Sequence, residues 1–374
     1  MKFKIPFIRP HFPNADDLVA DFRQIQENNW FTNFGPFENK LCDSISDIYQ
    51  TAAHVTTIAN ATLGIEAAVG VLMSSTGSQI EVLVPSFTFA AGPEVLIKSG
   101  MKPVFIDIEA DTWQPSLEQA SEYLKVNYQK VGGILLCNIF GVGNRKITQW
   151  ENLAGEYSIP LIIDSAAGFG SLYSAEEKIG LRGDCEIFSM HATKPFSVGE
   201  GGLVLSKNQD LIKKIRSYQN FGFDETRNVG MLGTNAKLQE LNCAIGLRQL
   251  DDFEQRLTTR RQSLGEYKKQ LQPRGVEFMQ NDNLSTVCFV SALMPTAEHA
   301  TDIYHALTEQ RVEVRRYYVP LHMQTVLLER SAIGGSLETT EDIFSRIVSL
   351  PVHDGMSSED IMYITDIITS RLSR

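Results

Sequence analysis

The sequence predicts an α/β fold with a large domain built on a mostly parallel sheet and a small C-terminal α+β domain. Between about residues 55 and 210, short apolar runs alternate with longer helix-compatible stretches, the pattern of successive βα units. The runs are rich in Val, Ile, Leu and Phe, as expected for strands covered by helices on both faces. The 374 residues exceed the roughly 100–200 of one typical domain. We therefore expect domains over 1–250 and 251–374.

The large domain is predicted to contain a series of short buried strands. They are Val55–Ile58, Glu81–Pro85, Pro103–Asp107, Gly133–Phe140, Pro160–Asp164, Glu186–Met190 and Gly202–Ser206. A helix over Thr62–Met73 follows the first of them. Ligands of such sheets bind beyond the carboxyl ends of the strands. Ser86, Asn138, Asp164 and Ser189 lie at these ends, so the site is expected there.

The apolar period becomes helical after about Lys237. Leu238, Leu241, Ile245 and Leu250 share one side, and the pattern continues through Phe253 and Leu257. It predicts one long amphipathic helix that leaves the large domain. Beyond it we expect short strands and two helices, at Thr286–Val290, Glu313–Tyr318, His299–Glu309 and Ser358–Arg371.

Composition excludes several classes of partner. A formal charge of −11 and a pI near 5.2 argue against nucleic acid, whose binding needs clustered Lys and Arg. No stretch reaches the ~18 apolar residues of a membrane span, and the segment Met1–Pro6 lacks the apolar core of a leader. We therefore expect no membrane partner and a cytoplasmic location. The five cysteines are odd in number and have no CxxC spacing, so neither a disulfide framework nor a metal site is expected.

An amine, a buried acid and a glycine pair follow one another along the chain. Asp164 ends an apolar strand, Lys194 lies in the run Ser189–Phe196, and Gly201–Gly202 come next. Pyridoxal phosphate requires such groups, because its aldehyde condenses with a lysine amine and its pyridine nitrogen pairs with a carboxylate. Taken singly, a solvated lysine and a loop carboxylate remain the structural alternatives.

Two further segments have the residues that would hold a phosphate and a flat ring. Ala61 and Thr62 follow Asn60 at a helix start, where free backbone amides bind anions, although an ordinary N-cap is the alternative. Phe89 follows a strand tip and could stack on a heteroaromatic ring, with core packing as the alternative. Asn235 lies in a polar loop and offers another phosphate ligand or a helix cap.

Together these motifs resemble the DegT/StrS-type nucleotide-sugar aminotransferases, a family of fold-type I pyridoxal phosphate enzymes. The resemblance extends over nearly the whole chain. It is carried by Thr32–Pro36, Val84–Phe89, Asp164–Ala166, Ser189 with Lys194 and Glu200–Gly202, Gly233–Asn235 and Pro320–His322.

The resemblance implies a role for each matching residue. Lys194 would bind the cofactor covalently and move the proton, Asp164 would pair with the pyridine nitrogen, and Phe89 would stack on the ring. Backbone at Ala61 and Thr62, with the hydroxyls of Thr62 and Ser189, would hold the phosphate.

The resemblance also implies a homodimer with shared active sites. Asn235 would reach the phosphate from the neighbouring subunit. Phe34, Tyr318 and His322 would lie on the substrate side, and a structural histidine is the alternative for His322.

Three positions depart from the family pattern. Ala167 replaces the usual Gln or His near the phenolic oxygen of the ring, and it can donate no side-chain hydrogen bond. Ala61 replaces a glycine of the phosphate cradle, which requires a negative φ at this position. Lys237 replaces an arginine, so a point charge replaces a planar fork.

The resemblance is strongest to the branch that aminates C4 of dTDP-4-keto-6-deoxyglucose to make dTDP-viosamine. We therefore expect a ping-pong transaminase with pyridoxal 5'-phosphate as cofactor, glutamate as donor, 2-oxoglutarate as by-product and a nucleotide ketosugar as acceptor. The alternatives are amination at C3, a non-nucleotide ketosugar, and a catalytically silent binding or regulatory protein. A nicotinamide dehydrogenase is disfavoured because no GxGxxG follows the first strand.

Overall fold

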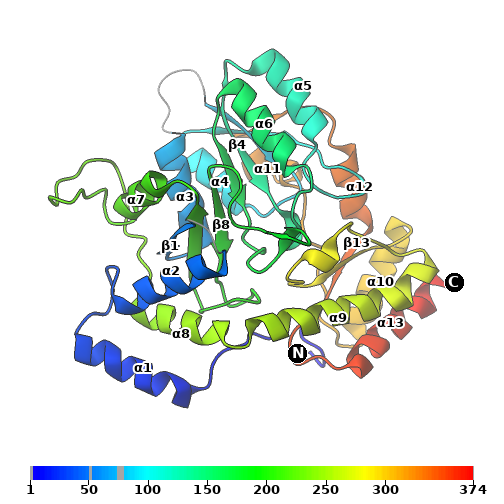
Figure 1. Ribbon diagram of the computed structural model, residues 1–374. Coiled ribbons are helices and arrows are strands. Elements are labelled where there is room, and N and C mark those ends of the chain that lie inside the picture. The colour runs from blue at the N-terminus through cyan, green and yellow to red at the C-terminus, as the bar shows by residue number, and fades with distance from the viewer. Residues whose placement is uncertain (1–2, 50–52, 74–79, 374) are drawn as a thin grey trace.

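The computed structural model describes residues 3–49, 53–73 and 80–373. The largest element is an eight-stranded sheet in the order β1-β9-β8-β5-β4-β2-β3-β12 (Figure 1). Its strands are β1 (His54–Ile58), β2 (Glu81–Pro85), β3 (Lys102–Ile106), β4 (Val131–Cys137), β5 (Leu161–Asp164), β8 (Cys185–Ser189), β9 (Gly202–Ser206) and β12 (Ala332–Ile333). Strand β9 runs antiparallel to both of its neighbours, and the other pairs are parallel. The predicted α/β class is confirmed.

Helices cover both faces of this sheet, which explains why its strands are apolar on both sides. One face carries α2 (Pro36–Ile48), α5 (Leu117–Asn127), α6 (Ile147–Tyr157) and α8 (Glu240–Leu250). The other face carries α3 (Ala61–Leu72), α4 (Ala91–Lys98) and α7 (Gln209–Tyr218). The helix α1 (Ala15–Asn28) packs along α8. A small hairpin, β6 (Leu172–Ser174) with β7 (Glu177–Lys178), follows β5.

The single long helix predicted after Lys237 is two helices. Helix α8 is followed by α9 (Phe253–Leu271), and the two lie end to end along one side of the molecule (Figure 1). Asp252 interrupts the backbone with φ −120° and ψ 8°. The apolar period continues across the break, so the pattern alone does not reveal it.

The C-terminal part contains a three-stranded sheet in the order β10-β11-β13 with its own core. Its elements are β10 (Glu277–Phe278), β11 (Val290–Leu293), α10 (Ala297–Glu309), α11 (Thr325–Leu328), α12 (Glu338–Arg346), β13 (Ile347–Leu350) and α13 (Ser358–Leu372). Leu264, Ile303 and Ile364 belong to this core, whereas Phe253 and Leu257 pack in the core of the large sheet. The domain boundary at residue 250 stays a proposal.

The strand predicted at Thr286–Val290 is wrong, because β11 begins only at Val290. The Thr286 amide donates to Ser171 Oγ at 3.0 Å, and its hydroxyl donates to the Ala167 carbonyl at 2.8 Å. These bonds attach the segment to the large domain in place of a strand ladder. The strand predicted at Glu313–Tyr318 is also absent as a regular element. Arg315 there forms an isolated bridge to Ser349.

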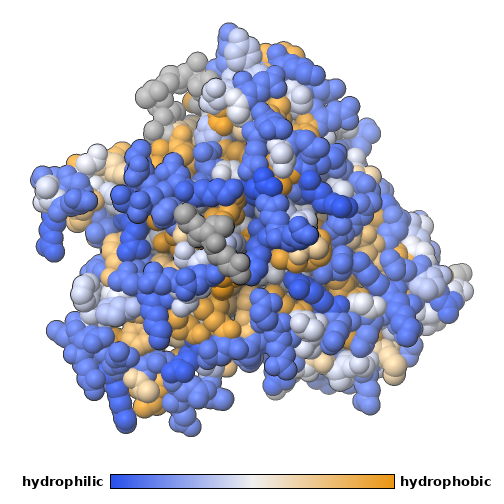
Figure 2. Space-filling model, in the orientation of Figure 1, coloured by the Kyte–Doolittle hydropathy of each residue, from blue (hydrophilic) through white to orange (hydrophobic). Residues whose placement is uncertain are grey.

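The outer surface shown in Figure 2 is mainly hydrophilic, with apolar side chains gathered in the lower centre between α2 and α8. Across residues 3–49, 53–73 and 80–373, every helix is too short or too polar to span a bilayer. Within the same ranges, no three His, Cys, Asp or Glu side chains are grouped as metal ligands.

Candidate active site

A cavity of about 460 Å³ lies beyond the carboxyl ends of β2, β4, β5 and β8, next to the N-terminus of α3. This is the edge of the sheet where the sequence places a site. The predicted site residues that line the cavity are Ala61, Thr62, Phe89, Asp164, Ser189, Lys194 and Tyr318. Residues far apart in the chain therefore meet in one cavity.

Asp164 is the last residue of β5 and is buried. Its Oδ1 accepts a hydrogen bond from the Ala166 amide at 2.9 Å. Burial raises the pKa of Asp164, and the Ala166 amide and the Lys194 ammonium oppose that rise. The carboxylate therefore gains by pairing with a cationic ligand group, such as a protonated ring nitrogen.

Lys194 lies in a loop that hydrogen-bonds to itself. The Lys194 amide donates to the His191 carbonyl at 2.8 Å, and the Ala192 amide donates to the Gly199 carbonyl at 2.8 Å. Gly199 has a φ of +96°, a conformation that favours glycine. The loop therefore presents the lysine to the cavity from a defined turn.

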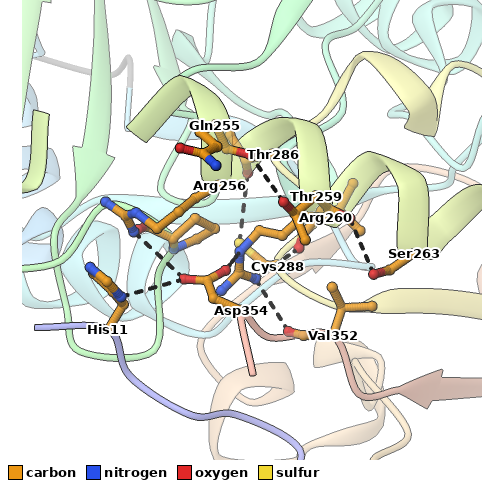
Figure 3. Close-up of polar contacts among 12 residues, drawn as sticks. His11, Gln255, Arg256, Thr259, Arg260, Ser263, Thr286, Cys288, Val352 and Asp354 are labelled. Atoms are coloured by element: carbon orange, nitrogen blue, oxygen red, sulfur yellow. Dashed lines mark hydrogen bonds and ion pairs between the residues drawn. The ribbon is translucent and has the colours of Figure 1, made fainter. Parts of the chain in front are cut away.

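A buried arginine supports this loop from behind. Arg256 of α9 donates from Nη1 to the Pro195 carbonyl at 2.7 Å, directly after Lys194. The same Nη1 lies 3.8 Å from Asp354, which also receives Arg260 Nε at 2.7 Å (Figure 3). His11 of the N-terminal arm approaches the same carboxylate at 4.0 Å. The lysine loop is thus connected to the N-terminal arm and to the segment after β13.

The N-terminus of α3 provides the candidate phosphate cradle. Asn60 is the N-cap and accepts the Leu63 amide at 2.9 Å, as the capping alternative predicted. Ala61 is the first helical residue and is absent from the positive-φ positions, so the substitution of the family glycine is sterically acceptable. The free amides at this helix start remain available to an anion, because the cap uses only one donor.

Aromatic side chains form one wall of the cavity. Phe89 is 59% exposed, and its ring centroid lies 5.9 Å from that of Tyr318. Tyr318 in turn lies 5.5 Å from the ring of Phe140. Burial raises the pKa of the Tyr318 hydroxyl, with further contributions from Cys137 and Cys288. The tyrosine therefore stays neutral as a potential hydrogen-bond donor.

Three of the residues assigned from the resemblance, Phe34, Asn235 and His322, lie outside this cavity. Phe34 stacks under the guanidinium of Arg216 at 4.0 Å. Asn235 is exposed, and its Oδ1 accepts Lys237 Nζ at 2.7 Å. The role of Phe34 on the substrate side and the role of Asn235 at the phosphate of a neighbouring subunit stay predictions.

His322 is buried and is held at both ring nitrogens. Its Nδ1 lies 2.6 Å from Ser86 Oγ, and its Nε2 lies 3.0 Å from Glu341 Oε1. This arrangement favours the structural alternative over a substrate contact.

Other cavity residues were not singled out from the sequence. Ile8 comes from the N-terminal arm, and Cys288 and Phe289 come from the segment Thr286–Val290, which the sequence predicts as a strand. Local sequence has no signal for them, since only the folded chain places them there.

The residues present fit pyridoxal phosphate. One cavity joins a lysine amine, a buried carboxylate whose pKa is raised, a serine hydroxyl and the amides of a helix start. A Cβ on Gly202 would lie 2.8 Å from the Asn60 carbonyl carbon and 2.9 Å from the Ala61 nitrogen. The missing side chain thus lets β9 approach the cradle closely.

A fold and a site of this kind define a pyridoxal phosphate-dependent enzyme. A model of the DegT/DnrJ/EryC1/StrS aminotransferase family matches residues 14–369, and the chain belongs to this family. Aminotransferases of this family act on sugars and depend on pyridoxal phosphate.

Known relatives match over nearly the whole chain. Protein Rv3402c of Mycobacterium tuberculosis is 44% identical over 361 residues, which are 96% of this chain and 88% of the relative. The dTDP-4-amino-4,6-dideoxy-D-glucose transaminase of Shigella dysenteriae is 26% identical and covers 96% of this chain and 97% of its own.

Solved structures show the same fold. A Bacillus cereus protein described as a PLP-dependent aminotransferase superposes with a TM-score of 0.91 at 30% identity, covering 97% of this chain and 99% of its own. DesI, crystallised with its TDP-sugar product, has a TM-score of 0.88 at 27% identity, covering 98% and 92%. The predicted family, fold-type I architecture and cofactor class are confirmed.

Proposed function

We propose that this protein transfers an amino group from glutamate to C4 of a nucleotide-linked 4-keto-6-deoxysugar, with dTDP-4-keto-6-deoxyglucose as the acceptor. The observation that carries the proposal is the meeting of Lys194, Asp164 and the α3 N-terminus in one cavity. The branch resemblance supports C4 as the carbon. A Shigella relative is named for the dTDP sugar, whereas an Escherichia coli relative is a GDP-perosamine synthase, so the nucleotide needs a direct test.

Pyridoxal phosphate, when bound, supplies an electron sink that stabilises negative charge at the carbon bearing nitrogen. In the proposed reaction, Lys194 Nζ would be the base that takes up and releases the proton of that carbon. Asp164 keeps the ring nitrogen protonated, which its buried position favours once it is paired. Thr62, Ser189 and the amides at the start of α3 would bind the phosphate.

A homodimer with shared active sites is part of the proposal. A partner surface is supported by exposed apolar side chains. They belong to α1, to the turn that follows it and to the loop after α7. They are Val19, Phe22, Trp30, Phe31, Phe221, Val229 and Leu232. Asn235 lies in the same loop and would reach the partner's cofactor. Light scattering of the wild-type chain tests the assembly, and a monomer that retains full activity would contradict it.

We further propose a cytoplasmic enzyme that supplies an amino-dideoxysugar, for example to lipopolysaccharide O-antigen. The product leaves as a nucleotide sugar, so a glycosyltransferase must consume it. Deletion of the gene followed by sugar analysis of the cell envelope would test this role, and an unchanged sugar composition would contradict it.

The deciding experiment is a visible spectrum of the purified protein before and after excess glutamate, followed by addition of candidate ketosugars. We expect the band of the bound cofactor to be lost with glutamate and restored by dTDP-4-keto-6-deoxyglucose. Lys194→Ala should abolish both changes while keeping the assembly. The exposed Lys207 provides the matched control, and Lys207→Ala should behave as wild type.

The outcomes separate the alternatives. Restoration only by a GDP or UDP ketosugar, or by a free ketosugar, would keep the transaminase and replace the acceptor. A product aminated at C3, identified by NMR, would move the reaction to another carbon. A protein that binds no pyridoxal phosphate would refute the assignment and favour a silent binding protein.

A further inference from the structure

Within the described part of the chain, one carboxyl group without a paired cation is buried beneath the active site. Glu186 lies inside β8 with 0% exposure. Its Oε1 accepts the amides of Gly180 and Arg182 at 2.8 and 2.9 Å, and its Oε2 accepts Ser165 Oγ at 2.7 Å. Four acceptor contacts including Tyr173 hold this carboxylate in a single orientation.

A chain of hydrogen bonds leads from this carboxylate to the cavity wall. Ser165, which follows Asp164, donates to Glu186 and accepts Asn138 Nδ2 at 2.8 Å. Asn138 lines the cavity, and its Oδ1 accepts the Asn144 amide at 3.0 Å. A serine hydroxyl has one proton, so its donation to Glu186 leaves its lone pairs to Asn138.

The two loops that end this chain are in contact. The Asn138 amide donates to the Asp164 carbonyl at 3.0 Å. A Cβ on Gly141 would lie 2.2 Å from the Ala167 carbonyl oxygen, so these segments pack against one another without spare room. A change in Ser165 or Asn138 is therefore transmitted to the turn after Asp164.

The groups that face Glu186 do not neutralise it. Tyr49 of the α2 end, Tyr173 of β6 and Cys185 of β8 are uncharged, and burial raises the pKa of each. The Arg182 guanidinium is engaged by Glu151 and Glu177. Burial raises the pKa of Glu186 to about 7, against the lowering by its hydrogen bonds. Its charge thus changes near neutral pH.

We propose that Glu186 is a positioning residue of the active site, whose carboxylate orients Ser165 and, through it, Asn138 and the turn that follows Asp164. The inference rests on the proposed role of this cavity as the cofactor site. When Glu186 is protonated, Oε1 is the poorer place for the proton, because it already accepts two amides. A proton on Oε2 points at Ser165 Oγ, so the hydroxyl proton of Ser165 must turn away and Glu186 then shares the two oxygen lone pairs with Asn138. The link to Asn138 is weaker in this state.

The test compares cofactor binding by Glu186→Gln, Ser165→Ala and the wild-type enzyme at pH values above and below about 7. Glu186→Gln imitates the neutral acid. Ser165→Ala removes the serine link while keeping the carboxyl, and Asn138 Nδ2 keeps its other hydrogen bond, to the Tyr173 hydroxyl at 3.0 Å. Ser206→Ala is the matched control, because this buried serine also makes two hydrogen bonds. Ser206 is the last residue of β9, at the opposite end of the strand from Gly202 and the cavity. Hydrogen exchange of the Asn144 amide reports the chain without the cofactor.

We expect the affinity of the wild type for pyridoxal phosphate to be about fivefold lower below the transition than above it, the size expected for one lost hydrogen bond. Both variants should already bind about fivefold more weakly above it, lack this pH step, and exchange the Asn144 amide faster. Ser206→Ala should keep the wild-type profile.

Two results would overturn the positioning role. One is an unchanged pH profile and unchanged Asn144 exchange in both variants. The other is a loss of thermal stability in both variants with wild-type cofactor affinity. A wild-type protein that binds no pyridoxal phosphate would instead refute the proposed function, and Asn144 exchange would still decide whether Glu186 orders this loop.

Discussion

Gly202 offers the sharpest test of how the phosphate cradle is built. This residue begins β9, and a Cβ placed on it would lie 2.8 Å from the Asn60 carbonyl carbon and 2.9 Å from the Ala61 nitrogen. Both distances are roughly 0.5 Å or more short of the ~3.5 Å at which carbon contacts become favourable. The obstructing atoms are backbone, so Gly202→Ala must push the start of α3 away from the sheet.

The size of the effect follows from overpacking. Inserting a methyl group into a well-packed interior costs about 1–3 kcal/mol. The clash displaces the N-cap and the first backbone amides of α3, so pyridoxal phosphate should also bind more weakly. We expect a loss of about 1–3 kcal/mol of unfolding free energy and about tenfold lower cofactor affinity, equivalent to ~1.4 kcal/mol.

Gly265 is the matched control, because a Cβ there would meet no atom within 4 Å. Gly265 is a solvent-exposed residue in the middle of α9, where alanine stabilises a helix by up to ~1 kcal/mol relative to glycine. Urea unfolding and fluorescence titration with pyridoxal phosphate measure both variants. The reasoning would be refuted if Gly202→Ala matched Gly265→Ala in stability and cofactor affinity, since the cradle would then not depend on the close approach of β9.

Three other perturbations test the network around the site. Burial raises the folded-state pKa of Glu186 from 4.5 to about 7, so the stabilising contribution of this group is present below about pH 4.5 and is lost as the pH rises through about 7. Relative to Glu186→Gln, the unfolding free energy of the wild type should fall by up to about 3 kcal/mol across this window. Parallel pH curves of the two proteins in urea unfolding would contradict this. Asn60→Ala removes the side chain that accepts the Leu63 amide and should cost about 1 kcal/mol, measured by thermal unfolding; an unchanged midpoint would show that the cap is dispensable. Arg256→Ala should lower the unfolding free energy by about 2–3 kcal/mol, less than the loss of a fully buried ion pair, because one of its partners is half-exposed. Arg274 is exposed, so Arg274→Ala should leave the unfolding free energy almost unchanged. Equal losses of the two variants in urea unfolding would refute a special role for Arg256.

Glu186 illustrates a conflict between stability and site geometry. Its ionised form is costly because it is buried without a paired cation, yet that form orders Ser165 and Asn138. Functional groups often reduce stability in this way. The two measurements on Glu186 should therefore have opposite signs above about pH 7, with lower stability and tighter cofactor binding.

Much of the large domain was accessible from the sequence because buried parallel strands have a strong local signature. Asp164 and Ser189 were expected at strand ends, and both line the cavity. They meet because the carboxyl ends of parallel strands lie at one edge of a sheet. The C-terminal part has weaker local signals. Thr286 bonds sideways to Ala167 and Ser171, and no local pattern indicates such a contact.

The roles of some site residues follow from their chemistry alone, whereas those of others depend on their partners in the folded protein. The chemistry of Lys194 suggested its function before any geometry was available, since an amine next to glycine-rich turns suits a carbonyl cofactor. His322 has equally suggestive chemistry, but Ser86 and Glu341 occupy both of its ring nitrogens. Glu186 had a signal in the sequence, a charged residue inside an apolar strand, whose meaning depended on the partners that folding brought to it.

The sequence by itself determined the α/β class, the positions of most large-domain strands along the chain and the residue types available for pyridoxal phosphate, because periodicity and residue chemistry are local properties. Only the tertiary structure decided which polar groups face the cavity and which are consumed elsewhere. Tyr318 joins a wall with Phe140, and Arg256 supports the loop of Lys194. The pattern of an apolar face predicts that it will be buried, but it does not predict which distant segment will cover it. The side-chain hydrogen bonds of the site depend on that packing, so they cannot be predicted from the local sequence.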